Sequence, residues 1–189
     1  MQTPKLFMLL LGCRPAGRTT EQHDVFFGIG NSARELVPAL KAFWPEAGGS
    51  LHVDAWREVT RVGQYRIAVV PRNESQPAEA ASLIHLYFLN LGGYKQAQFD
   101  EFHYKLLLIA PDSATAIRQA RQTAFYKHTG FTGATAHVDD KYGVDVDELY
   151  QVRDILAPEL KQAYRLQITP APLGEEDVLH LGYFKLQKL

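Results

Sequence analysis

Two short motifs in the first third of the chain combine imidazole and carboxylate groups at a spacing of two residues. They are Glu21-x-His23 and His52-x-Asp54. Successive side chains on a β-strand alternate between its two faces, so on strands the members of each pair would point the same way. If the two strands are neighbours, the four groups meet at one spot. There they could bind Zn, Mn or Fe, or transfer protons as a general acid and base.

The same residue types recur in the second half of the chain. A shift of 80 positions carries the first motif onto Glu101-x-His103, and with five extra residues the second motif falls on His137-Val138-Asp139. The candidate metal ligands are the four histidines His23, His52, His103 and His137, and the full candidate polar cluster is Glu21, His23, His52, Asp54, Glu101, His103, His137 and Asp139. A purely structural role is the leading interpretation of this cluster, because polar groups at strand ends commonly bond to the backbone; a metal site and metal-free acid–base chemistry are the alternatives. Survival in both copies favours a structural role that both share, because duplicated active sites commonly decay in one copy.

The recurrence extends beyond these motifs. The same shift lays Leu6–Gly12 on Leu86–Gly92 without a gap. Further along, Tyr65-Arg66-Ile67 resembles Tyr164-Arg165-Leu166. Several matches in the same order predict an internal duplication.

Each repeat predicts an α+β fold with the order strand, strand, helix, strand, strand. Leu6–Leu11 and Leu83–Leu91 are nearly continuous apolar runs, which are typical of strands buried on both faces. A helix is expected after Ser32, which forms a capping-box signal with Glu35, and its counterpart is expected after Asp112.

These patterns divide the chain into a first repeat over 1–72, a linker over 73–81 and a second repeat over 82–189. A small repeat buries little surface alone, so we expect the two to dock around a shared or adjoining core. Pro38 predicts that the first helix kinks or begins late. The segment 147–156 has apolar residues that suit a helix, but its place in the repeat favours a strand.

The residues that carry the repeat resemble a known family. They are Leu-x-Leu-Gly, a Glu-x-His about nine residues later, the His-x-Asp strand and the stretch Leu86-Tyr87-Phe88-Leu89-Asn90-Leu91-Gly92-Gly93-Tyr94. These features are similar to those of the domain-of-unknown-function 1543 family. The resemblance covers most of the chain and implies a bacterial protein with one or two copies of a small module. It supplies no catalytic residues, and Cys13 departs from it because the second copy has Gly93 there.

Two glycine-rich segments imitate nucleotide-binding loops. Gly12–Thr19 has the spacing of a phosphate-binding loop, except that Arg18 stands where lysine belongs, and a strand rather than a helix is expected to follow. Arg14 and Arg18 remain candidates for binding an anion. Gly28–Ala33 lies between a strand and a helix, as in dinucleotide-binding folds, but the second copy builds the same turn from Leu108–Asp112 without the glycines.

The composition excludes several classes of protein. With 20 basic and 21 acidic residues among 189, the formal net charge is −1, so no chain-wide field attracts nucleic acid. The single cysteine, Cys13, excludes an internal disulfide and fits a reducing cytoplasm. No apolar run approaches the roughly 20 residues of a membrane span. Leu6–Cys13 imitates a short lipoprotein signal, but the same segment recurs mid-chain, so we expect a cytoplasmic protein that does not bind membranes.

Two functions are consistent with these observations. The leading expectation is a non-catalytic binding or interaction module, for example a homodimer, whose loops or sheet edges receive a protein or small-molecule partner. The alternative is a small metal-dependent enzyme that holds a divalent transition metal with the Glu-x-His and His-x-Asp pairs. A cleft that brings His23 and His52 within a few ångströms favours the enzyme, whereas widely separated, backbone-bonded histidines favour the binding module.

Overall fold

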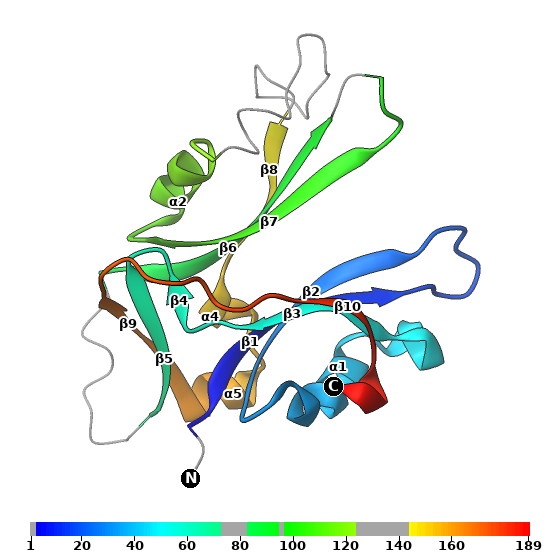
Figure 1. The fold of residues 1–189 in the computed structure, drawn as a ribbon, viewed down its shortest axis with the longest axis horizontal. Coiled ribbons are helices and arrows are strands. Elements are labelled where there is room, and N and C mark those ends of the chain that lie inside the picture. The colour runs from blue at the N-terminus through cyan, green and yellow to red at the C-terminus, as the bar shows by residue number, and fades with distance from the viewer. Residues whose placement is uncertain (1–2, 73–82, 95–96, 124–143) are drawn as a thin grey trace. The chain divides into compact units, whose positions relative to one another are not determined.

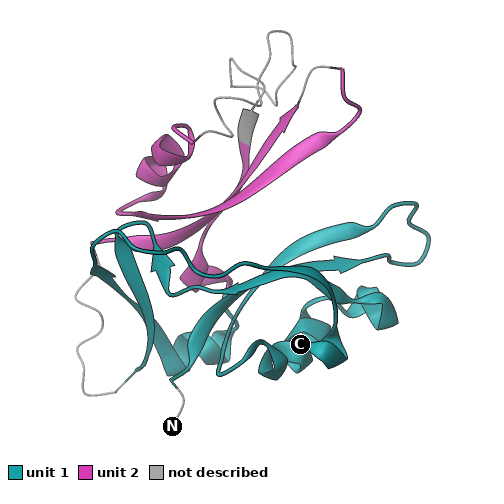
Figure 2. Cartoon of the chain, viewed as in Figure 1, with its two compact units in different colours: residues 1–76, 156–189 teal, residues 77–155 magenta. Residues whose placement is uncertain are grey.

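The computed structural model describes residues 3–72, 83–94, 97–123 and 144–189. Antiparallel strands and short helices make up a mixed α+β fold, as predicted (Figure 1). The chain forms two compact units (Figure 2). Unit 1 contains residues 1–76 and 156–189, and unit 2 contains residues 77–155.

Unit 1 is built on a four-stranded antiparallel sheet. Its order is β10–β3–β1–β2, from β1 (Lys5–Cys13), β2 (Gln22–Gly30), β3 (His52–Glu58) and β10 (His180–Lys185). The apolar run of the chain's first strand therefore has a hydrogen-bonded neighbour on each side. This confirms the buried strand predicted for that run, and it makes β1 the centre of the sheet.

One face of this sheet packs against short helices. They are η1 (Ala33–Leu36), α1 (Val37–Phe43), η2 (Pro45–Ser50) and η3 (Leu186–Lys188). The buried cluster that joins them to the strands consists of Phe7, Leu9, Leu11, Cys13, Ala33, Leu36, Leu40, Ala47, Leu51, Val53 and Leu186. Because alternate residues of β1 belong to this core, the residues between them, including Gly12, face the other side of the sheet.

The helix expected after Ser32 begins late. Pro38 lies in the first turn of α1, where a missing N–H costs no helical hydrogen bond, and a 3-10 turn precedes it. The predicted capping box is wrong, because the Ser32 side chain makes no capping hydrogen bond. Glu35 instead accepts a hydrogen bond from the backbone N–H of Asn31 at 2.8 Å.

A second, three-stranded sheet in unit 1 joins segments that are far apart in the sequence. Its order is β4 (Arg61–Val62), β5 (Tyr65–Pro71) and β9 (Tyr164–Pro170), and α5 (Pro158–Ala163) leads into the last strand. In the pair of β5 with β9, the first residue of each strand lies opposite the last residue of the other. The two segments that match in sequence therefore pair symmetrically.

Unit 2 is built on a three-stranded antiparallel sheet. Its order is β7–β6–β8, from β6 (His85–Tyr94), β7 (Glu101–Ala110) and β8 (Val144–Gln151), with helices α2 (Ser113–Ala120) and α4 (Val152–Ile155). Its buried cluster consists of Tyr87, Leu89, Leu91, Leu106, Ala110, Ala116 and Ala120. This sheet and the β3–β1–β2 part of the first sheet share one arrangement, in which the first strand lies between the second and the third.

The structure differs from the sequence-based expectation at two places in the C-terminal half. The segment 147–156 is a strand only as far as Gln151 and then turns into α4, where Val152 is fully buried. Residues 156–189 also join unit 1 instead of packing with the rest of the expected second repeat, 82–189. They do so because β9 and β10 pair with β5 and β3.

The N-cap predicted at Asp112 is present. Its carboxylate accepts a hydrogen bond from the backbone N–H of Thr115 at 2.7 Å, and this bond lowers the pKa of Asp112. A carboxyl with a lowered folded-state pKa stabilises the fold above its unfolded-state pKa, and this stabilisation is lost as the pH falls through the folded-state pKa.

We expect Asp112→Ala to lower the thermal unfolding midpoint at neutral pH, and Asp112→Asn to keep most of the cap. At about pH 2 the difference between wild type and Asp112→Ala should shrink. Ser32→Ala is the matched control, because the Ser32 side chain makes no capping bond and its removal should leave the midpoint unchanged. Thermal denaturation followed by circular dichroism measures this, and equal midpoints for Asp112→Ala and wild type at neutral pH would contradict it.

Candidate functional site

A row of three residues crosses three strands of the unit 1 sheet, near one end of each strand. Gly12 of β1 lies directly opposite His23 of β2 on one side and His52 of β3 on the other. Gly12 faces away from the helix-covered core, because its neighbour Leu11 belongs to that core and pairs with the core residue Val53. Both histidines therefore project from the sheet face that the short helices leave open.

A β-bulge brings a carboxylate to this row. In the pairing of β1 with β3, Leu10 lies opposite Ala55 and Leu11 opposite Val53, so Asp54 is the extra residue of the bulged strand. Bulges bend a strand locally and re-aim a side chain, and they are common beside functional sites. The re-aimed residue here is an acid that ends beside two imidazoles.

Glu21, His23, His52 and Asp54 converge as the motifs predict, and we call these four residues the unit 1 site. The His52 Nε2 atom lies 3.0 Å from Glu21 Oε1 and 3.3 Å from Asp54 Oδ1. The His23 Nε2 atom lies 3.2 Å from Asp54 Oδ2 and 3.8 Å from Glu21 Oε2. Each imidazole thus faces both carboxylates.

His52 is the innermost member of this site. Its side chain is 3% exposed, whereas the side chains of His23 and Glu21 are 44% and 45% exposed and that of Asp54 is 26% exposed. The ring of Tyr183 covers His52, with ring centroids 4.1 Å apart. The site is therefore closed at His52 and open to solvent on the side of Glu21 and His23.

The protonation of His52 follows from its other nitrogen. Nδ1 lies 2.9 Å from the carbonyl oxygen of Ser50, which can only accept, so Nδ1 carries the hydrogen. In the neutral ring Nε2 then presents a lone pair toward the carboxylates. Despite the short distances, Nε2 of His52 and Oδ2 of Asp54 are buried and have no hydrogen-bond partner. Buried polar atoms of this kind need a partner, which a metal cation or a second proton would supply.

Gly12 leaves the space that the site occupies. A Cβ atom at this position would lie 2.5 Å from both Asp54 Oδ2 and His52 Nε2, closer than atoms can approach without something moving. The glycine of the Leu-x-Leu-Gly motif is therefore required by the side chains that lie across it, rather than by a turn in the backbone.

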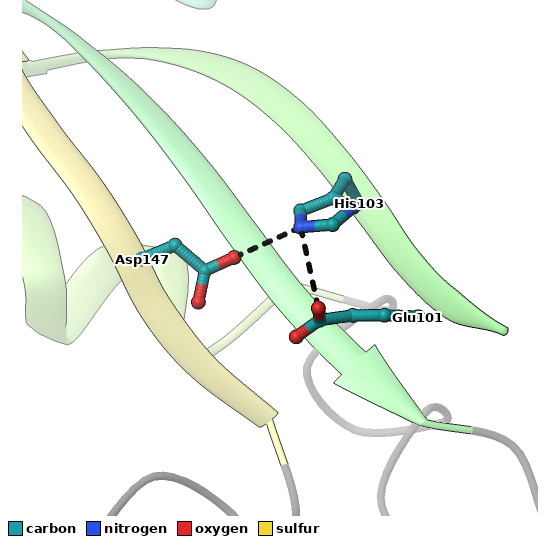
Figure 3. Close-up of side chains that lie close together, drawn as sticks. All are labelled: Glu101, His103 and Asp147. Atoms are coloured by element: carbon teal, nitrogen blue, oxygen red, sulfur yellow. Dashed lines mark ion pairs between the residues drawn. The ribbon is translucent and has the colours of Figure 1, made fainter. Parts of the chain in front are cut away.

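Unit 2 repeats this arrangement with three described side chains, and we call Glu101, His103 and Asp147 the unit 2 site (Figure 3). His103 Nε2 lies 3.3 Å from Asp147 Oδ2 and 3.9 Å from Glu101 Oε2. One ligand atom from each residue lies within 4.8 Å of the others. The three side chains could therefore hold one cation between them.

The backbone that positions the unit 2 site matches that of unit 1. Gly92 lies opposite His103, and a Cβ on Gly92 would collide with the carboxylate of Asp147. Asp147 is again the extra residue of a bulge, because Asn90 lies opposite Glu148 and Leu91 opposite Val146. The hydroxyl of Tyr94 is hydrogen-bonded to Glu101, which raises the pKa of Tyr94.

Comparison with known families places the unit 1 site within a recognised segment. Residues 18–69 match the family described as Domain of Unknown Function (DUF1543). This segment is similar to the DUF1543 domain. This confirms the family predicted from the motifs, and the DUF1543 segment contains all four residues of the unit 1 site.

The fold as a whole also has a solved counterpart. The chain is similar to the crystal structure of a protein Il1583 from Idiomarina loihiensis, with a TM-score of 0.61 and 22% sequence identity over 97% of each chain. At this identity the likeness concerns the fold alone. The comparison with curated proteins gave no match. Among the described residues, no helix is both long and apolar enough to cross a membrane.

The motifs outside the DUF1543 segment were predicted only in part. Glu101 and His103 lie close together, as expected. The segment of unit 2 that corresponds to the start of β3 is residues 145–147 of β8, by its pairing with β6, and not the predicted 137–139. His137 and Asp139 lie outside the described residues. Sequence reasoning missed Asp147, although Val146-Asp147 repeats the Val53-Asp54 dipeptide, because the tripeptide His137-Val138-Asp139 matched His52-Val53-Asp54 completely.

The two glycine-rich segments that resemble nucleotide-binding loops have structural explanations. Arg14 and Arg18 lie on the exposed connection between β1 and β2, and that connection leads into a strand, not into a helix that could bind phosphate. Gly28 belongs to β2, and a Cβ there would crowd Phe26 and Leu36. Close packing therefore accounts for the glycine that imitated a dinucleotide fingerprint.

Proposed function

We propose that this protein binds a divalent transition metal at the unit 1 site and acts as a small metal-dependent enzyme. The observation that carries the proposal is the buried Nε2 atom of His52, which faces two carboxylates without a hydrogen-bond partner. Imidazole and carboxylate together suit Zn, Mn and Fe. The carbonyl of Ser50, which fixes the ring through Nδ1, is the kind of outer partner that metal-binding histidines usually have.

The distances between the groups also support a metal. Ligand atoms about 2.1 Å from one metal ion lie about 3.0 Å apart at right angles and about 3.4 Å apart at tetrahedral angles. From His52 Nε2, the separations of 3.0 Å to Glu21 Oε1 and 3.3 Å to Asp54 Oδ1 fall in this range, and His23 Nε2 lies 3.2 Å from the other oxygen of Asp54, Oδ2. Only the separation of 3.8 Å between His23 and Glu21 is longer, and these are the two most exposed members.

The open side of the site supports catalysis rather than a structural metal. Structural metal sites are closed by four protein ligands, whereas catalytic sites keep a position for water or substrate. A metal between Glu21 and His23 would meet solvent, because nearly half of each side chain is exposed. When bound, the metal would act as a Lewis acid or lower the pKa of a bound water. Glu21, the more exposed of the two carboxylates, is then the residue that can orient that water or accept a proton from it.

A non-catalytic interaction module remains the second candidate. It is supported by β10, which lies at the edge of the unit 1 sheet, carries the exposed apolar side chains Leu181 and Tyr183 and is preceded by the exposed Leu179. An exposed apolar edge could pair with a protein partner or with a second copy of the chain in a homodimer. The buried free thiol of Cys13 is compatible with a cytoplasmic location.

We also propose that the two units descend from one duplicated module. The support comes from three shared features: the strand arrangement, the carboxylate at the bulge and the glycine beneath it. The pairing of β5 with β9 also supports a duplication, because these two strands resemble each other in sequence and pair end to end in opposite directions.

The test of the metal proposal uses protein without a histidine tag, purified without chelator. We expect near-stoichiometric Zn, Mn or Fe by elemental analysis. Adding back the metal after chelation should raise the unfolding free energy by about 2.7 kcal/mol at a free concentration 100 times Kd. Protein that contains no transition metal and whose unfolding midpoint does not respond to added Zn²⁺, Mn²⁺ or Fe²⁺ would remove the proposal. The interaction module would then be the better account.

A further inference from the structure

We propose that the two sites select different cations, and that His52 is the residue that separates them. The inference rests on the proposed metal binding and adds the class of metal at each site. It begins from a comparison of equivalent positions. Three of the four positions in the unit 1 site recur unchanged in unit 2, as Glu101, His103 and Asp147.

The fourth position differs in type. His52 lies opposite Gly12 in unit 1, and the residue opposite Gly92 in unit 2 is Asp145. Because the other three positions have the same residue types in both sites, the two sites differ in their donor atoms only at this fourth position. Unit 1 offers two imidazole nitrogens and two carboxylates, whereas the described members of the unit 2 site offer one imidazole and two carboxylates.

This difference in donors predicts a difference in metal. Imidazole suits Zn, Cu, Fe and Ni, while carboxylate and water suit Mg, Ca and Mn. The second nitrogen of the unit 1 site therefore favours Zn²⁺. The unit 2 site, which has more oxygen than nitrogen donors and side chains that are 36% and 38% exposed at Glu101 and His103, favours a harder, more hydrated ion such as Mn²⁺.

His52 is also suited by its environment to enforce the choice. It is the most buried group of either described site, and the Ser50 carbonyl and the Tyr183 ring hold it from two sides. A ligand fixed in this way cannot move aside for a water molecule. The unit 1 site therefore keeps its second nitrogen, whatever ion is offered.

The test measures Zn²⁺ and Mn²⁺ binding to the full chain, with Zn²⁺ followed by competition with a chromogenic chelator and Mn²⁺ by the loss of its free-ion paramagnetic resonance signal. In wild type we expect one tight Zn²⁺ site that His52→Ala abolishes and one Mn²⁺ site that His103→Ala abolishes. His52→Asp places in unit 1 the residue type found opposite Gly92 in unit 2. It should lower Zn²⁺ affinity at least about a hundredfold and change Mn²⁺ affinity much less. Loss of an outer partner of a metal ligand costs 10- to 100-fold in affinity, so loss of a direct ligand should cost more.

His52→Gln guards against a folding defect in His52→Asp, because it keeps a polar group near the position of Nε2, and it should also lower the Zn²⁺ affinity of unit 1. If wild type binds neither ion, the proposed function itself fails. If wild type binds two Zn²⁺ ions with equal affinity and prefers Zn²⁺ to Mn²⁺ at both sites, metal binding stands but the separation by His52 is overturned. The same holds if folded His52→Asp or folded His52→Gln leaves the ratio of Zn²⁺ to Mn²⁺ affinities unchanged.

Discussion

Replacing His52 with alanine is expected to lower the Zn²⁺ affinity of the unit 1 site at least about a hundredfold, since even outer partners of metal ligands are worth 10- to 100-fold. The substitution removes the one ligand that is fully enclosed and already oriented by the Ser50 carbonyl. The exposed members Glu21 and His23 cannot compensate, because holding them in one geometry costs side-chain entropy. Isothermal titration of the chelator-treated protein with Zn²⁺ measures the effect.

His180→Ala is the matched control for this prediction. His180 lies on β10 and stacks on Trp56 with ring centroids 3.9 Å apart, so it is a partly enclosed histidine of the same unit that takes no part in the site. Its replacement should leave Zn²⁺ affinity unchanged. Equal losses in His52→Ala and His180→Ala would mean that the histidines act through stability and not through coordination.

Replacing Gly12 with alanine is expected to weaken Zn²⁺ binding at least about tenfold, because catalytic and metal sites tolerate displacements of only about 0.5 Å. The added methyl would lie 2.5 Å from both Asp54 Oδ2 and His52 Nε2, so at least one ligand must shift. Since Asp54 is partly exposed and sits on a bulge, it is the group that we expect to move. Metal-free stability should fall by about 1–3 kcal/mol, as in other overpacked sites.

Gly49→Ala provides the control for Gly12→Ala. No atom lies within 4 Å of a Cβ built on Gly49, so the same chemical change there should leave metal affinity unchanged. Gly92→Ala should weaken binding at the unit 2 site and leave the unit 1 site intact, because its Cβ would strike Asp147. Zn²⁺ affinity in Gly12→Ala equal to wild type would show that the row across the sheet is not a metal site.

Periodic features of the sequence predicted their structures well. The apolar run of β1, the cap at Asp112 and the convergence of Glu21-x-His23 with His52-x-Asp54 all follow from local patterns, because alternation along a strand fixes which side chains share a face. Pro38 also marked the late helix start correctly, since its ring restricts it to the first turn.

Features that depend on pairing between distant segments could not be predicted. A bulge is a break in periodicity, so nothing in the spacing of Asp54 or Asp147 announced that each would be the extra residue. The return of β9 and β10 to unit 1 depends on hydrogen bonds between segments about a hundred residues apart. The sequence also predicted the wrong counterpart of His52-Val53-Asp54. His137-Val138-Asp139 matches it in every residue, whereas the strand that pairs with β6 contains Val146-Asp147, and sequence similarity alone does not show which segment pairs.

The location of bound metal in crystals of the Zn²⁺-loaded protein tests the central claim most directly. Anomalous diffraction at the zinc absorption edge should give a peak about 2.0–2.2 Å from Nε2 of His52 and from a carboxylate oxygen of Asp54. His23 or Glu21 should complete the coordination, with at least one position taken by water. Zinc bound only elsewhere, with His52 Nε2 donating a hydrogen bond to Glu21 or Asp54, would contradict the account.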